Sequence, residues 1–273
     1  MMRSMMSKLV PVTVLALALG LALAPAARAG MRYEARTVTD VDRGQDGTMV
    51  AKGWIEGERG RVELGEVEGP QARVLGGGYL VTTDGGRIVY LVDPKEKTYS
   101  RFDLAGALGA LGQMMQAMGG VVDFDISNVA NEMVLEEAGP SILGHDTKHY
   151  RWKTSYVFEL SVMGFQQRNE VQTVTDTWVA EGIVQPGFGV WLQNRPVATG
   201  DEDLDAMIAA EASRVKGMPL KSVAETVTRN KKGRESRSTV TTEVTLLEET
   251  SVEDAMFQVP AGYEEVPGLT PHG

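Results

Sequence analysis

The chain has 273 residues, with 27 Lys and Arg against 37 Asp and Glu, a formal net charge of −10 at neutral pH and no cysteine. An acidic chain repels nucleic acid and bare anionic lipid surfaces at long range, so neither is an expected partner. The lack of cysteine excludes disulfides, thiol catalysis, cysteine-ligated metals and the acylated cysteine of a bacterial lipoprotein.

The first 29 residues have the pattern of a cleaved secretory signal peptide. Arg3 and Lys8 precede an apolar run, Leu9–Ala24, and Ala27-Arg28-Ala29 places small residues at the two positions that signal peptidase reads. The run is shorter than the roughly 17–25 residues that cross a bilayer, so a retained membrane anchor is the weaker alternative. Cleavage leaves 24 Lys and Arg against the same 37 acids, a charge of −13. We therefore expect a periplasmic or secreted protein without an integral membrane anchor.

The remainder, residues 30–273, is long enough to bury a core without disulfides. We expect it to form a single β domain, with residues 266–273 as a frayed tail. The expected fold class is mainly β (α+β): a curved antiparallel sheet that forms a half-open β-barrel, with short helices as a lid or a plug.

Alternating polarity carries this expectation. Tyr79–Val81 and Arg87–Val92 flank Asp84-Gly85, which supplies the positive φ of a hairpin turn, so the two runs should pair. The clearest strand is Thr147–Val162, where one face is aromatic, with Tyr150, Trp152, Tyr156 and Phe158, and the other is polar. A similar alternation follows the polar turn at 231–234. Long two-faced strands favour a strongly curved sheet or an open barrel.

Two segments have helical rather than strand spacing. The first begins after Asp103, a plausible N-cap, and places apolar side chains at Leu104, Leu108, Leu111, Met115 and Met118, with no charged residue before Gly119. A helix without a charged face must be covered or must cover something. Its flexible methionine side chains are suited to binding apolar partners of variable shape. They are equally explained if the helix fills one end of the barrel core. The second helix, Asp203–Arg214, is ordinarily amphipathic.

The histidines do not indicate a metal site. His145 and His149 are four residues apart, but the strand register puts them on the polar face beside Arg151 and Lys153. Cations disfavour a bound metal ion, and no further ligand converges. We expect solvent-facing or turn-capping histidines and no metal.

No pattern for catalysis is present either. There is no Gly-x-Ser-x-Gly nucleophile elbow, and Gly76-Gly77-Gly78 leads into a strand without the Gly-Lys-Ser/Thr ending of a phosphate loop. Acid pairs such as Glu136-Glu137 point to opposite faces of a strand. We expect a protein that is not an enzyme and has no cofactor.

Four short motifs, in this order, resemble the LolA/LolB-like superfamily, and within it the exported members of unknown function. They are Leu91-Val92-Asp93-Pro94 with Tyr99, Gly144 with His149-Tyr150, Asp176-x-Trp178, and the closing Phe257-x-x-Pro260-x-Gly262-Tyr263. The resemblance implies a half-open antiparallel β-barrel around an apolar cavity, with short helices as its lid. It also implies carriage of acylated lipoproteins, or, as in other relatives, the sensing of envelope stress.

Two functional hypotheses stay open. In the first, a lipid, an acyl chain or a lipidated envelope protein binds in an apolar cavity. The candidate lining is Leu104, Leu108, Leu111, Met115, Met118, Tyr150, Trp152, Tyr156, Phe158 and Trp178. In the second, the chain is a non-catalytic scaffolding or protein-interaction module whose barrel core is filled by its own side chains.

Overall fold

The computed structural model describes residues 30–42, 44–68, 78–103, 122–162, 165–184 and 217–266. The expected leader, both expected helices and residues 267–273 lie outside these ranges. Within the ranges, no helix has the length and apolar character needed to span a bilayer.

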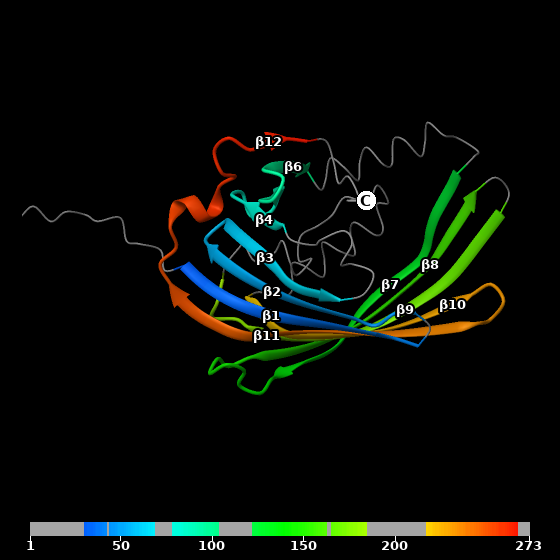
Figure 1. Ribbon diagram of the computed structural model, residues 1–273. Coiled ribbons are helices and arrows are strands. Elements are labelled where there is room, and N and C mark those ends of the chain that lie inside the picture. The colour runs from blue at the N-terminus through cyan, green and yellow to red at the C-terminus, as the bar shows by residue number, and fades with distance from the viewer. Residues whose placement is uncertain are drawn as a thin grey trace, which may run out of the picture.

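The described residues form one sheet with the strand order β12-β6-β5-β4-β3-β2-β1-β11-β10-β9-β8-β7 (Figure 1). The strands are β1 (Gly30–Val41), β2 (Gly47–Glu56), β3 (Arg59–Glu68), β4 (Tyr79–Thr82), β5 (Ile88–Asp93), β6 (Thr98–Asp103), β7 (Val122–Ala138), β8 (Lys148–Val162), β9 (Phe165–Ala180), β10 (Met218–Asn230), β11 (Glu235–Thr250) and β12 (Glu264–Glu265). Neighbours are antiparallel except β12, which is parallel to β6. The predicted curved, mainly antiparallel β fold is confirmed.

The predicted hairpin is confirmed as β4 and β5, where Tyr79 lies opposite Val92. Its connection is longer than the expected two-residue turn. The Asp84 carboxylate accepts hydrogen bonds from Thr82 Oγ1 (3.1 Å), the Ile88 amide (3.0 Å) and Arg87 Nε (3.2 Å). Partial burial opposes ionisation of Asp84, but these bonds outweigh it and lower the pKa of the carboxyl group.

The strand predicted at 147–162 is β8, and it pairs with β9 along its whole length without a register shift. The alternation read from the sequence therefore holds over the entire strand. The second alternating segment lies in β11, and the polar turn before it joins β10 to β11.

The main core shows how the sheet curls. Val62 and Leu64 of β3 belong to the same buried cluster as Ala180 of β9 and Leu220 of β10, although four strands separate β3 from β9 in the sheet. The sheet must therefore bend back on itself, as Figure 1 shows. The face that carries the buried Tyr33 on β1, with its register partners in β2 and β3, lies inside the bend, and we call it the concave face.

Tyr33 is 2% exposed, and burial raises the pKa of its phenol. Its ring lies over Gly53 of β2, where an added Cβ would stand 2.0 Å from a ring carbon. Glycine is required at this position because only a residue without a Cβ leaves room for the ring.

Residues 259–266 close the opposite face near β4 to β6. Val259 and Tyr263 pack against a buried cluster of Tyr79, Val81 and Val92. The β12 segment pairs with β6, where the Glu264 amide donates to Lys97 O (3.0 Å) and the Val266 amide to Tyr99 O (2.8 Å). Tyr263 of the closing motif thus packs on the cluster of β4 and β5, and the residues that follow the motif cover the edge of β6.

Candidate ligand-binding face

The strand registers place a series of uncharged residues on the concave face of β1, β11, β10, β9 and β8. Crossing these strands from Thr37, the register partners are Thr242, Ser222, Thr177 and Tyr150 in turn. Partners directly opposite each other in a sheet share a face. The concave face therefore continues from the packed core of β1 to the aromatic side of β8.

The members of this continuous surface, which we call the threonine face, have no charge. They are Thr37 and Thr39 on β1, Ser236, Ser238, Val240 and Thr242 on β11, Ser222, Ala224, Thr226, Thr228 and Asn230 on β10, Gln167, Asn169, Val171, Thr173, Thr175 and Thr177 on β9, and Thr154, Tyr156, Phe158 and Leu160 on β8. Most are half-buried rather than fully buried.

Several hydroxyl groups on the threonine face bind one another across strands. The oxygen atoms are 3.0 Å apart in Thr37 and Thr242 and 3.1 Å apart in Thr173 and Thr226. A hydroxyl group that is already hydrogen-bonded loses little when an apolar group displaces water from it. The pairing therefore allows a threonine surface to accept apolar contact at low cost.

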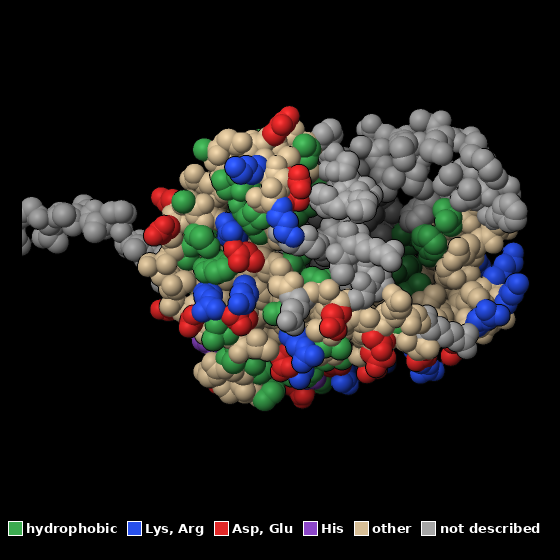
Figure 2. Space-filling model, in the orientation of Figure 1, with side chains coloured by type: hydrophobic (Ala, Val, Ile, Leu, Met, Phe, Trp, Pro, Cys, Tyr) green, Lys and Arg blue, Asp and Glu red, His purple; other side chains and the backbone are tan. Residues whose placement is uncertain are grey.

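The convex face of the same strands carries the charges. Arg151 Nε bonds Asp176 (2.8 Å), Lys221 Nζ lies 3.8 Å from Glu243, and Arg229 bonds Glu235 (2.7 Å). In Figure 2 the acidic and basic side chains follow the outer, lower surface, whereas hydrophobic side chains line the hollow to the right. The two faces of one set of strands thus differ sharply in charge.

The aromatic residues predicted on β8 divide into two pairs. Tyr150 and Trp152 are 3% and 1% exposed and form a small cluster with Val179 and Met133. Burial, together with the hydrogen bond from the phenol to Glu181 (2.9 Å), raises the pKa of Tyr150. Tyr156 and Phe158 are half-buried farther along the strand. The first pair is core, and the second pair belongs to the threonine face.

Trp178 does not lie with these aromatic residues, which corrects the grouping expected from the sequence. It pairs with His149 and so points to the convex face. Its indole stacks on the His149 ring, with the centroids 4.5 Å apart and the planes 6° from parallel. Since face assignment depends on the pairing with β8, the pattern of β9 alone did not reveal it.

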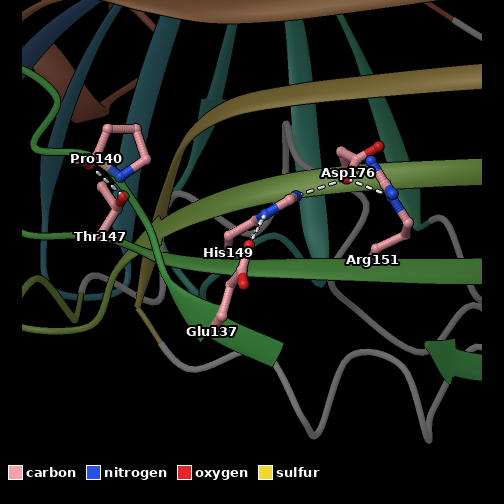
Figure 3. A network of polar contacts seen from close by, with 6 residues as sticks. All are labelled: Glu137, Pro140, Thr147, His149, Arg151 and Asp176. Carbon is pink, nitrogen blue, oxygen red and sulfur yellow. Dashed lines mark hydrogen bonds and ion pairs between the residues drawn. The ribbon is translucent and has the colours of Figure 1, made fainter. Parts of the chain in front are cut away.

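His149 is likewise not solvent-facing, although it is on the polar face as expected. It is 9% exposed, and its Nε2 lies 2.5 Å from Asp176 Oδ1 while its Nδ1 lies 3.4 Å from Glu137 Oε1 (Figure 3). Arg151 donates to the same Asp176 carboxylate, which raises the pKa of Arg151. The two carboxylates come from the strands on either side of β8, a convergence that no local motif signals.

His145 lies in the turn before β8, as expected, where its amide donates to Ile142 O (2.9 Å). Glu136 and Glu137 face opposite sides of β7, with Tyr150 and His149 as their register partners. Among the residues that the structure describes, no group of three or more His, Asp or Glu side chains has a geometry that holds a metal ion. Five of the predicted lining residues, Leu104, Leu108, Leu111, Met115 and Met118, lie outside the described ranges.

No family model and no curated protein matches the chain. Among solved structures, the chain is similar to a LolA superfamily protein from Nitrosomonas europaea, with 11% sequence identity and a TM-score of 0.32. The likeness covers 85% of this chain and 90% of that protein.

Proposed function

We propose that this chain is an exported protein of the cell envelope that binds a lipid, an acyl chain or a lipidated partner on its concave face, as a carrier or a sensor. One observation carries the proposal. Charged side chains occupy the convex face of β8 to β11 and β1, while the positions that make up the threonine face have none. Lys148, at the start of β8 on the same side as Tyr150, lies beyond this face and is ion-paired with Glu136 (2.5 Å).

An uncharged hollow suits an acyl chain because no ionised group has to lose its water when the chain arrives. Each methylene that leaves water contributes about 0.8 kcal/mol. Tyr156 and Phe158 supply apolar contact at one side of the face, and the paired hydroxyls between the strands supply a neutral surface. The expected export signal at residues 1–29 and the motif resemblance to LolA-like proteins agree with an envelope role.

The expected uncharged helix, with Leu104, Leu108, Leu111, Met115 and Met118, completes the proposal as a lid over the bound ligand. The amphipathic segment Asp203–Arg214 is the second lid element. No catalytic step and no cofactor are part of the proposed function.

The buried cluster around Tyr33 favours the alternative function, a scaffolding module. Tyr33, Ile55, Val62, Leu64 and Leu220 fill one end of the concavity with the protein's own side chains. If the whole concavity is filled in this way, the protein acts through its outer surface and takes no ligand.

A matched pair of variants on β9 tests the proposal. Thr173→Glu places a carboxylate on the threonine face, whereas Gln172→Glu places one on the exposed convex face next to it. A fluorescent fatty-acyl probe should bind the wild type and Gln172→Glu equally and Thr173→Glu at least roughly tenfold more weakly. Equal binding by the two variants, or no binding by the wild type, would support the scaffold.

The lid has its own test, Leu108→Glu, with probe titration and thermal unfolding of the same protein. A lid can swing into water and expose the new carboxylate, so probe binding should be lost while the melting temperature stays nearly unchanged. A large fall in melting temperature would instead identify this segment as fixed core.

A further inference from the structure

The turn between β10 and β11 gathers cations in a chain that is strongly acidic overall. Lys231, Lys232 and Arg234 are all exposed there, and no described residue forms an ion pair with any of them. Figure 2 shows Lys and Arg side chains along the right rim of the hollow, where Figure 1 places the end of this hairpin.

The neighbouring acids are already paired with other cations. Glu235 binds Arg229 and Arg237, with the closest contact at 2.7 Å. Glu159 and Glu170 both pair with Arg168. These carboxylates therefore do not neutralise the three cations of the turn.

The next acids on the two sides of the turn lie farther away. On the β1 side, the Asp42 amide donates to Arg237 O (3.0 Å), which places Asp42 beside β11 and three residues, roughly 10 Å, along it from Arg234. Asp125 on β7 is opposite Glu159 of β8, which is opposite Arg168 of β9, and β10 follows. Three strand spacings of about 4.8 Å place Asp125 roughly 14 Å from β10. Both distances exceed the screening length of about 8 Å at physiological salt. A surface that touches the turn thus meets positive charge, although the whole protein repels anions at long range.

Hydrogen bonds give the turn a defined shape. The Asn230 side-chain oxygen accepts the amides of Lys232 and Arg234, both at 3.0 Å, and Gly233 adopts a φ of 73°. The Lys231 amide donates to Arg168 O (3.0 Å), which ties the turn to the neighbouring strand. The cations are therefore held at the tip rather than on a loose loop.

The turn also lies close to the aromatic part of the threonine face. Phe158 pairs with Asn169, and Asn169 pairs with Asn230, so two strand spacings separate Phe158 from the start of the turn. This amounts to roughly 10 Å. A phospholipid places an anionic headgroup and an apolar chain at a comparable separation, which matches cations at the rim and an uncharged face behind them.

We propose that the β10–β11 turn docks the protein on the anionic headgroups of a phospholipid membrane and directs the threonine face toward the lipid. This inference rests on the proposed function and names the surface at which the ligand is exchanged. Juxtamembrane cations each change membrane affinity about fivefold, so three together should account for roughly 100-fold.

The test uses protein recovered from exporting cells and vesicle co-sedimentation. The wild type should bind vesicles that contain phosphatidylglycerol more tightly than vesicles of phosphatidylcholine alone. The variant with Lys231→Gln, Lys232→Gln and Arg234→Gln should lose roughly 100-fold on the anionic vesicles. A control with Arg36→Gln, Lys95→Gln and Arg101→Gln, three exposed cations on other strands and turns, should keep wild-type binding within about threefold.

Equal losses in the two triple variants would overturn the docking surface, because net charge alone would then explain the binding. The docking surface would also be overturned if the wild type showed no preference for anionic vesicles, or if the turn bound single-stranded DNA but no vesicle. Probe titration without vesicles separates the two proposals. The turn variant should bind the acyl probe normally, whereas a wild type that binds anionic vesicles but no probe would defeat the proposed function and leave the docking surface standing.

Discussion

The concave surface has two parts. In both, every second residue of a strand faces inward, but the two parts differ in the types of side chain at these inward positions. Around Tyr33, Ile55 and Val62 it consists of large apolar side chains that are less than 5% exposed. On β8 to β11 it consists mainly of threonine, serine and other uncharged side chains, with two half-buried aromatic residues. The first part is built to stabilise the fold. In the second part, uncharged polar side chains occupy the concave positions and contribute little apolar burial to a core. This is expected of a surface that binds a ligand.

The largest difference between the two parts should appear in truncation. Ile55→Ala removes a side chain that is 1% exposed and should lower the free energy of unfolding by about 2–5 kcal/mol. Val171→Ala, on the half-buried threonine face, should cost about 1 kcal/mol or less. Chemical denaturation measures both, and similar costs would show that the two parts are equally packed.

Overpacking of the core part should cost somewhat less. Gly53→Ala drives a methyl group into the Tyr33 ring, so we expect a loss of about 1–3 kcal/mol in unfolding free energy. The matched substitution Gly182→Ala, where no atom lies within 4 Å of the new Cβ, should change stability by less than about 0.5 kcal/mol. Thermal unfolding of the two variants decides this, and a harmless Gly53→Ala would contradict the close contact.

Alkaline pH should weaken the core part through Tyr33. Burial raises the pKa of its phenol above the ordinary value of 10.0, so the folded state favours the protonated form. This contribution is fully present below pH 10 and falls as the pH rises, by up to about 1.4 kcal/mol per pH unit. Unfolding measured from neutral pH upward should show this decline, and Tyr33→Phe should flatten it. A Tyr33→Phe variant that declines as steeply as the wild type would assign the effect to the other tyrosines.

The smallest effect should come from the threonine face itself. Thr173→Val leaves the Thr226 hydroxyl without its partner and should cost about 1 kcal/mol, while the double variant with Thr226→Val should recover most of that loss. A double-mutant cycle by denaturation measures the coupling. Acyl-probe binding should be unchanged or tighter in the double variant, and a clear weakening would mean that the hydroxyls themselves contact the ligand.

The sequence predicted the parts of the fold that depend on local alternation. Thr147–Val162 and the Tyr79–Val92 hairpin were recognisable because a period of two and an Asp-Gly turn are local signals. The placement of Trp178 was wrong because the face of a β9 residue depends on its register with β8. The burial of His149 was missed for the same reason, since Glu137 and Asp176 reach it from two other strands.

The threonine face could also not be predicted from the sequence of any one strand. Each strand shows only that threonine and serine alternate with other residues, some of them charged, as Thr175 and Thr177 do with Asp176. The uncharged surface appears when the four registers that join these five strands align the positions on one side. The proposed lid around Leu108 stays a prediction from helical spacing.

Native mass spectrometry of the protein recovered from the cell envelope tests the central claim most directly. The account predicts a bound lipid or acyl species that is present in the wild type, is retained in Gln172→Glu and is lost in Thr173→Glu. A wild type that carries no ligand and binds no added acyl probe would contradict the account and identify the concavity as a core filled by the chain itself.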